Sequence, residues 1–216
     1  MFGFAETKSS SSSLSNPDSP QYKAVEWLAQ DKVDNESNWS GYELLQRYVL
    51  RVLYHSTDGE NWSGSPCCFD ADTTWFGASM ACGWGSDDVR CGGSGQQVDY
   101  IDLSNGNLRG TIPTELGLLT ALSYLSLYDN RLTGTIPTAL TQLNNLYRLY
   151  LHKNSLIGQV PSVFCAAPFP DWRADGRFGN GLSADCISEV QCDCCDLCYD
   201  ESNDCFYWNG SGFSSC

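Results

Sequence analysis

The chain has 216 residues and a formal net charge of −14, from 26 acidic and 12 basic side chains. This length is enough for one sizeable core. The acidic balance argues against nucleic-acid phosphates and anionic lipids as partners. No apolar run approaches the length of a membrane span, so we expect none.

The chain contains twelve cysteines in two groups that flank a central segment. Four precede it (Cys67, Cys68, Cys82 and Cys91), and Cys165 with seven more lie after it. An even number in this arrangement predicts disulfide-stapled ends in an extracellular, cell-surface or luminal oxidising compartment. Four glycosylation sequons agree with that prediction: Asn35, Asn38, Asn61 and Asn209. Met1–Ala5 does not resemble a signal peptide, so either a targeting segment was removed upstream or the numbering begins inside a longer protein; we favour the first.

The sequence of the first 97 residues predicts a flexible N-terminal arm followed by a helical cap. Low complexity at Ser9–Ser13 predicts a flexible Ser-rich arm over residues 1–18. Ser19 and Pro20 suit the N-cap and first turn of a helix that runs roughly to Ala29, with Val25 and Leu28 on one face. A polar linker is expected over 31–40.

A second helix is predicted after Gly41, because apolar residues recur at helical spacing. They are Leu45, Tyr48, Val49, Val52 and Leu53. The helix ends before a turn at Asp58-Gly59, and the stretch 63–95 is loop-rich and stapled. We therefore expect residues 19–97 to form a helical, disulfide-stapled N-terminal cap that covers the open edge of the central segment.

Residues 98–164 repeat three times with a period of 24 residues. The columns are Leu108, Leu132 and Leu156; Gly110, Gly134 and Gly158; and Ile112-Pro113, Ile136-Pro137 and Val160-Pro161. Such a period is typical of a solenoid. Apolar trios such as Leu122, Leu125 and Leu127 predict short strands that stack into a narrow parallel sheet over a shared core.

The other columns predict how each turn of the solenoid closes. Asn130 and Asn154 come after the strands, where a buried amide can bond the backbone, and Gly106 interrupts this column in the first unit. The prolines favour a return path outside any sheet. Four leucines refill the core from that side: Leu116, Leu119, Leu140 and Leu143.

The run Leu122–Leu143 resembles the plant-type leucine-rich repeat, L-x-x-L-x-L-x-x-N-x-L-x-G-x-I-P. Three flanking segments resemble secreted algal leucine-rich-repeat proteins: Tyr48–Trp62, Ala81–Cys91 and Leu182–Cys198. The resemblance implies an α/β solenoid, a short right-handed superhelix with a narrow parallel sheet that binds ligands on its concave face. The repeat period, the predicted helices and the cysteine groups predict three repeats over 98–164, a helical N-terminal cap and a disulfide-rich C-terminal cap over 165–216. We expect little regular structure in the tail.

The outward residues of the predicted strands form the best candidate binding face. They are Tyr100, Asp102, Tyr124, Tyr128, Tyr147, Arg148, Tyr150 and His152. Tyrosine is a frequent anchor at interfaces, and charge changes from acidic on the first strand to basic on the third. The alternative is that tyrosine simply suits a strand surface.

No metal site or cofactor is expected. Cys192, Cys195 and Cys198 have zinc-like spacing, but no histidine is nearby and disulfides are favoured. We expect one specific bridge, between Cys82 and Cys91. With two histidines and no nucleophile-elbow or phosphate-loop motif, the chain is predicted to be non-catalytic, although a paired-carboxylate hydrolase stays open.

Three functions remain open at this point. The first is an extracellular recognition module for a protein, peptide or glycan, as the resemblance to plant receptor ectodomains and polygalacturonase inhibitors implies. The second is an accessory subunit of a larger assembly, docked through the arm and the caps. The third is an ice or mineral binder, against which we count the short threonine ladder, since Gln159 takes the place of a third threonine after Thr111 and Thr135.

Overall fold

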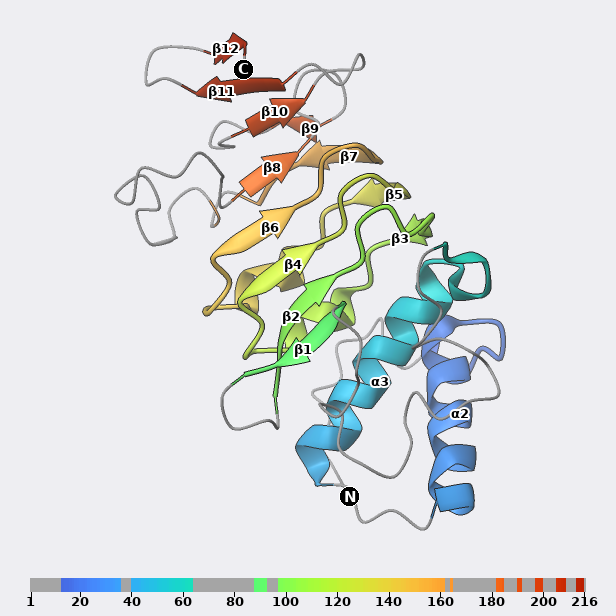
Figure 1. Ribbon diagram of the computed structural model, residues 1–216. Coiled ribbons are helices and arrows are strands. Elements are labelled where there is room, and N and C mark those ends of the chain that lie inside the picture. The colour runs from blue at the N-terminus through green and yellow to red at the C-terminus, as the bar shows by residue number, and fades with distance from the viewer. Residues whose placement is uncertain are drawn as a thin grey trace.

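The computed structural model describes residues 13–35, 40–63, 88–92, 97–161, 164 and 182–184, and four further strands after residue 189. For residues 31–35 and those four strands it describes the backbone alone. Two helices stand at one end of a ladder of strands, and the C-terminal strands continue the ladder at the other end (Figure 1).

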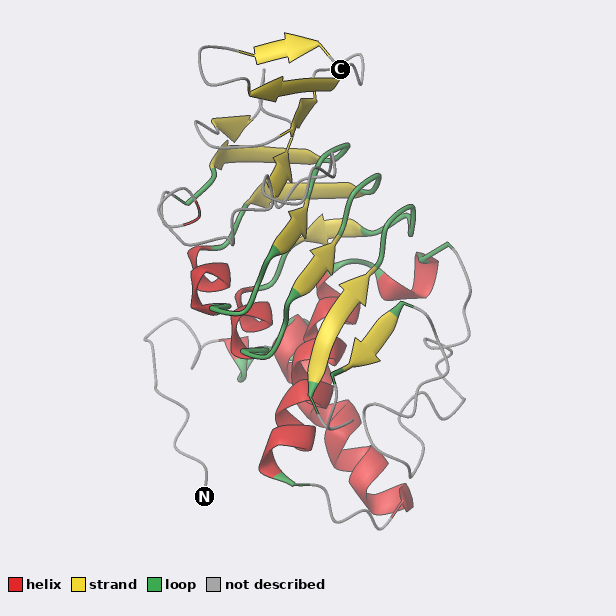
Figure 2. Ribbon diagram, turned by 60° about the vertical axis from the view of Figure 1, so that its left-hand side comes forward, coloured by secondary structure: helices red, strands yellow, loops and turns green. Residues whose placement is uncertain are grey.

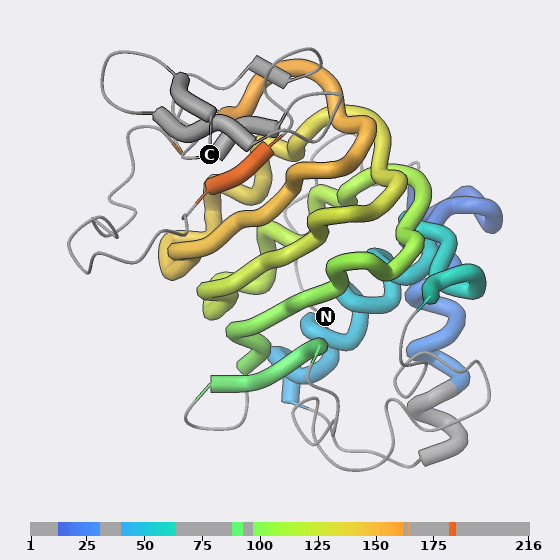
Figure 3. The backbone as a smooth tube through the Cα atoms, turned by 45° about the horizontal axis from the view of Figure 1, so that its top comes forward, coloured from blue at the N-terminus to red at the C-terminus, as the bar shows by residue number. Residues whose placement is uncertain are grey.

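The larger sheet carries the predicted parallel strands. In spatial order it contains β1 (Val89–Cys91), β2 (Val98–Asp102), β4 (Tyr124–Ser126), β6 (Arg148–Tyr150), β8 (Leu182–Ala184), β10 (Leu197–Tyr199), β11 (Cys205–Trp208) and β12 (Phe213–Ser215). Tyr100 pairs with Tyr124, and Tyr124 pairs with Arg148. Each step of the ladder therefore advances the chain by one 24-residue repeat, and Figure 3 shows these turns stacked in succession.

A second sheet, which was not predicted, lies between the asparagine turn and the proline of each repeat. It contains β3 (Arg109–Thr111), β5 (Arg131–Thr135), β7 (Ser155–Gln159) and β9 (Val190–Gln191), all parallel. The residues between the asparagine turn and the proline are extended, so their backbone groups pair with those of the next turn. The prolines act only afterwards: Pro113 and Pro137 precede the 3-10 helices η3 (Thr114–Leu118) and η4 (Thr138–Gln142), drawn with the other helices in red in Figure 2.

The register of the second sheet is a further argument against a regular threonine ladder. Thr111 pairs with Thr133, and Thr135 pairs with Ile157. The repeat-related threonines are therefore not direct neighbours across the strands, and an exposed isoleucine interrupts the row.

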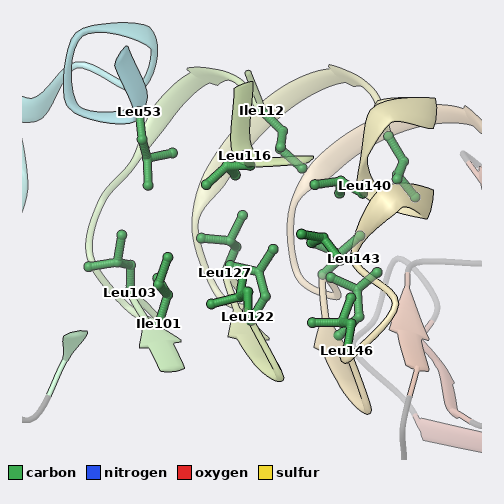
Figure 4. Packing of buried hydrophobic residues seen from close by; sticks show 14 of the residues in the cluster. Leu53, Ile101, Leu103, Ile112, Leu116, Leu122, Leu127, Leu140, Leu143 and Leu146 are labelled. Atoms are coloured by element: carbon green, nitrogen blue, oxygen red, sulfur yellow. The ribbon is translucent and has the colours of Figure 1, made fainter. Parts of the chain in front are cut away.

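The leucine columns fill one core, as predicted. Leu108, Leu125, Leu132 and Leu149 are fully buried, and Leu116 and Leu140 enter from the 3-10 helices with no exposed surface (Figure 4). Burying a leucine side chain stabilises the fold by about 1.5–3 kcal/mol. No repeat can bury its leucines without a neighbour, so the stacking itself holds the solenoid together.

The asparagine turn closes each repeat onto the next. The Oδ1 atom of Asn130 accepts hydrogen bonds from the amides of Gly106 and Leu108, both at 3.0 Å. Its Nδ2 atom donates to the carbonyls of Leu103 and Leu127 at 2.8 and 2.9 Å. One side chain thus satisfies backbone groups of two consecutive turns. Gly106 takes the place of asparagine in the first unit, where a Cβ would lie 2.5 Å from Leu108 Cδ1 and 3.1 Å from the Leu103 carbonyl oxygen.

The first helix, α2 (Pro20–Asn35), is longer than predicted. Ser19 caps it as expected, since its Oγ accepts from the amide of Tyr22 at 3.1 Å. The predicted end at Ala29 is wrong, because the polar residues after it continue the helix. The predicted apolar face is also wrong in part: Leu28 is buried together with Ala24, whereas Val25 is 46% exposed.

The second helix, α3 (Gly41–Ser56), lies against the first repeat. It begins with a capping box between Ser40 and Glu43, which was not predicted. Leu53 joins the leucine core. A Cβ at Gly110 would lie 2.3 Å from the Ser56 carbonyl oxygen, and the amide of Arg109 donates to the Thr57 carbonyl at 3.0 Å. After a 3-10 turn, η1 (Gly59–Asn61), the amide of Ser63 donates to the carbonyl of Gly106.

The C-terminal region contains more regular structure than predicted. Strands β8 and β10 extend the parallel ladder, and β11 and β12 add antiparallel strands. Cysteine spacing alone could not reveal them, because these segments lack the leucine pattern. In the part of the chain that the structure describes, no helix is long and apolar enough to cross a membrane.

Replacing Asn130 with Ala would leave buried backbone donors and acceptors of two turns without partners. We expect the free energy of unfolding to fall by about 2–4 kcal/mol, since each unsatisfied buried group costs about 1–3 kcal/mol. Chemical denaturation measures this loss. The control is Asn144→Ala, at an exposed position, which should change stability by less than about 0.5 kcal/mol. Equal stability of the two variants would contradict this role of the asparagine turn.

His55 makes stability depend on pH. Burial, with Arg51 and Lys23 nearby, lowers the pKa of His55 to about 4, whereas the pKa of a histidine in an unfolded chain is about 6.5. The unfolded state therefore binds more protons between these values, and the folded state loses stability as pH falls through this range. Glutamine does not titrate, so His55→Gln should lose less stability on acidification than the wild type. Because His55 is partly exposed and solvent screens its charge, we expect the difference in the free energy of unfolding to be about 1–2 kcal/mol. Denaturant titrations at about pH 7 and about pH 4.5 test this, and the same acid loss in variant and wild type would contradict it.

Candidate functional site

The face of the larger sheet that points away from the leucine core, which we call its outer face, brings most of the predicted binding residues together. Tyr100, Tyr124 and Arg148 are neighbours in register on β2, β4 and β6. The next outward line is formed by Asp102, Ser126 and Tyr150. The leucines between these positions point into the core, so alternation along short strands separates the two sets.

Five aromatic side chains form a continuous row across this face, which we call the aromatic row: Tyr100, Tyr124, Tyr150, His152 and Tyr128. The rings of Tyr100 and Tyr124 are stacked, with centroids 4.3 Å apart and planes within 15°. Tyr150 meets the Tyr124 ring edge-to-face at 5.6 Å. His152 lies next, at 6.4 Å from Tyr150, and stacks on Tyr128 at 4.9 Å. Ser126 is fully buried between Asp102 and Tyr150, although it points outward.

Arg90 belongs to this face but was not predicted. It pairs with Tyr100 from the antiparallel strand β1, and its guanidinium carbon lies 4.6 Å from the centre of the Tyr100 ring. Such a contact is a cation–π interaction, which contributes about 0.5–1 kcal/mol at exposed sites. Arg90 was expected in a stapled loop, since a three-residue strand has no recognisable period.

Asp102 is held in a fixed position at the acidic end of the row. Its Oδ1 atom accepts from the amide of Ser104 at 3.2 Å and from the hydroxyl of Ser104 at 2.7 Å. Its Oδ2 atom accepts from the Tyr100 hydroxyl at 3.2 Å. Burial, and after it the charge of Asp102, raises the pKa of both Tyr100 and Tyr124. The tyrosines are therefore neutral hydrogen-bonding groups at physiological pH.

His152 is neutral and locked at the other end of the row. Burial, and after it the charge of Lys153, lowers the pKa of His152 to about 4. Its Nδ1 atom lies 2.6 Å from the hydroxyl oxygen of Ser183, a fully buried residue of β8. Ser183 was not predicted, because the tail was expected to contain little regular structure.

Two predicted residues lie beside the row. Tyr147 precedes β6, is 40% exposed and contacts the guanidinium of Arg148 at 5.5 Å. In the part of the chain that the structure describes, its ring meets no other ring. Arg148 lies in register with Tyr100 and Tyr124, on the third repeat strand, and is the basic end of the predicted change from acidic to basic charge. Arg90 modifies that gradient, since it adds a cation at the acidic end.

Other predicted positions fall partly outside the described residues. Cys91 is disulfide-bonded, but Cys82 lies outside the described residues, so their pairing stays a prediction. Asn61 is exposed, and its Nδ2 atom donates to Asp58 at 2.9 Å. Asn35 is the last residue of α2 and its side chain is not described, whereas Asn38 and Asn209 lie outside the described residues. Within the described ranges, no three histidine, cysteine or acidic residues are grouped as metal ligands.

Comparison with known proteins identifies the repeat. Residues 121–143 match the family model described as Leucine Rich Repeat. A search of curated protein sequences finds no match. Among solved structures, the ectodomain of the receptor kinase SOBIR1 from Arabidopsis thaliana is 25% identical, with a TM-score of 0.42, and the match covers 59% of this chain and 62% of that one.

Two further structures resemble the chain at a similar level. The Arabidopsis receptor kinase HAESA, solved with the peptide hormone IDA and the co-receptor SERK1, is 23% identical with a TM-score of 0.43, over 63% of this chain and 24% of that one. A plant ice-binding protein is 25% identical with a TM-score of 0.46, over 58% and 36%. The chain thus spans less than two thirds of the length of each structure.

The matched segment agrees with the geometry around it. The matched segment contains β4 and β5, and strands one repeat earlier and one repeat later pair with them in parallel. Residues 121–143 are therefore a leucine-rich repeat, and the strands one repeat earlier and one repeat later continue the same geometry.

Proposed function

We propose that the chain is a non-catalytic recognition module that works outside the cell and binds a protein, peptide or glycan on the outer face of the larger sheet. The observation that carries this proposal is the aromatic row. Five rings from consecutive repeats contact one another on a single face, together with Asp102, Arg148 and Arg90.

The packing of the row favours binding over a purely structural role. Tyrosine offers a large amphipathic surface with few rotatable bonds. The rings hold one another, and hydrogen bonds fix Asp102 and His152. Side chains that are ordered before binding lose little further entropy on binding, and this improves affinity. A sheet that needed only strand-forming residues would not require such contacts between its side chains.

Two side chains support an extracellular location. Cys91 is disulfide-bonded, as is usual in oxidising compartments. Asn61 stands in a sequon with Ser63, and its side chain is exposed. We further propose that α2 and α3 act as the N-terminal cap, which the place of Leu53 in the leucine core supports, and that the cysteine-rich segment 165–216 caps the other end.

Replacing Tyr124 with Ala should remove the centre of the row, since Tyr124 contacts both Tyr100 and Tyr150. In affinity pull-downs from the native source, we expect at least about a tenfold loss of bound ligand, the usual consequence of removing an aromatic anchor. Tyr22→Ala on α2 is the matched control and should bind as wild type. Circular dichroism verifies folding.

The same experiment distinguishes recognition from the alternative function, that of an accessory subunit in a larger assembly. If Tyr124→Ala binds as wild type while deletion of residues 1–18 abolishes binding, the chain is an accessory subunit docked through its arm. That result would contradict the choice of the aromatic row as the binding site.

The extracellular location predicts a glycan on Asn61. In protein purified from its native source, enzymatic release of N-glycans should convert Asn61 to Asp, and peptide mass spectrometry detects this change. Asn144 is also exposed but lies in no sequon, so it should stay unmodified. A fully unmodified Asn61 would count against passage through the secretory pathway.

A further inference from the structure

Asp102 carries a negative charge on the aromatic face that meets only neutral donors among the described residues. Its three side-chain hydrogen bonds come from the Ser104 amide, the Ser104 hydroxyl and the Tyr100 hydroxyl. Within the described part of the chain it forms no ion pair. Arg90, the cation on the adjoining strand β1, lies over the Tyr100 ring instead.

The half-buried Asp102 carboxylate lacks an opposite charge among the described residues and has an unused hydrogen-bonding position. Water is partly excluded there, so a charge is stabilised less by solvent and attracts an opposite charge more strongly than on an open surface. A carboxylate offers about four lone-pair positions. The Oδ1 atom uses its two positions on Ser104, whereas Oδ2 has one donor, so Oδ2 can accept a further hydrogen bond from a ligand.

The ring packing indicates what kind of ligand reaches this carboxylate. Tyr100 has Tyr124 on one face, toward β4, and Arg90 on the other, toward β1. Tyr128 and His152 cover a face of each other. Sugars and nucleobases bind aromatic residues by stacking on open ring faces. Both faces of the Tyr100 ring, which lies next to Asp102, are thus covered, so a ligand there reaches the ring edge and not an open face. Phenol hydroxyls of the row can donate to and accept from the backbone groups of an extended peptide.

We propose that the ligand is an extended peptide segment that carries a lysine or arginine, whose cationic group binds Asp102 Oδ2. This inference rests on the proposed recognition function and assigns Asp102 as its specificity-determining residue. The net charge of −14 supports a basic partner, since it attracts cationic segments from a distance. A charge-assisted hydrogen bond to a fixed carboxylate gives both strength and orientation.

Selection from a phage-displayed library of short random peptides tests the proposal. Immobilised wild-type protein should enrich peptides with lysine or arginine at one fixed position. Asp102→Asn keeps the size of the side chain and an acceptor for Ser104, and should lower binding of synthetic copies of those peptides about tenfold or more. Binding should also weaken with added salt.

The matched control is Asp129→Asn, which removes one charge from an exposed turn after β4. Asp129 has a positive φ of 54°, which asparagine tolerates, so the variant should fold and bind as wild type. Enriched peptides without a basic preference, or equal binding by Asp102→Asn, would overturn this inference and leave the recognition function standing. A library without any enriched peptide, together with binding to an array of immobilised oligosaccharides, would overturn the peptide assignment in favour of a glycan. No binding in either format would overturn both proposals.

Discussion

The burial of leucines between successive turns is the constraint on which the rest of the structure depends. Each turn contributes an incomplete apolar layer, and only a neighbour in the correct register covers it. Sliding one strand by a single residue would expose its leucines and bury its tyrosines. The asparagine turns reinforce this register, since Asn130 and Asn154 bond carbonyls of two successive turns.

The same register creates the candidate site. Because Ile101, Leu125 and Leu149 are aligned inside the core, Tyr100 and Tyr124 are aligned outside it, close enough to stack. The binding face is therefore a consequence of core packing and needs no separate element to position it. Contributions from β1 and β8 extend the face beyond the three repeats, through Arg90 at one end and Ser183 at the other.

Much of this arrangement could be predicted from the sequence, because repetition shows which positions are equivalent. A column of leucines identifies the core, and the residues between them must then face outward. Short-range chemistry was also readable: Ser19 caps α2 and Gly106 interrupts the asparagine column. The failures have a common cause. Strands β1, β8 and β10 to β12 lie outside the repeats, and backbone pairing with a neighbour leaves no signal in their sequences. The second sheet lies inside the repeats, but its leucine and glycine columns do not reveal that the backbone there is paired.

The details of the site were beyond sequence reasoning for a related reason. A list of five tyrosines does not reveal that Tyr100 is covered on both faces, or that Asp102 receives only neutral donors. These facts depend on rotamers and on Arg90, which comes from outside the repeats. The covered faces of Tyr100 are the reason why the proposed ligand is a peptide and not a stacked sugar.

The most direct test of this account is the solvent exposure of the two sets of side chains, measured by NMR with a soluble paramagnetic probe. The structure predicts that the methyl signals of Leu125 and Leu149 keep their intensity, because these side chains are fully buried. The ring signals of Tyr124 and Tyr150 should broaden, because these half-buried side chains reach solvent. Broadened leucine methyls beside protected tyrosine rings would contradict the register of the solenoid and with it the binding face.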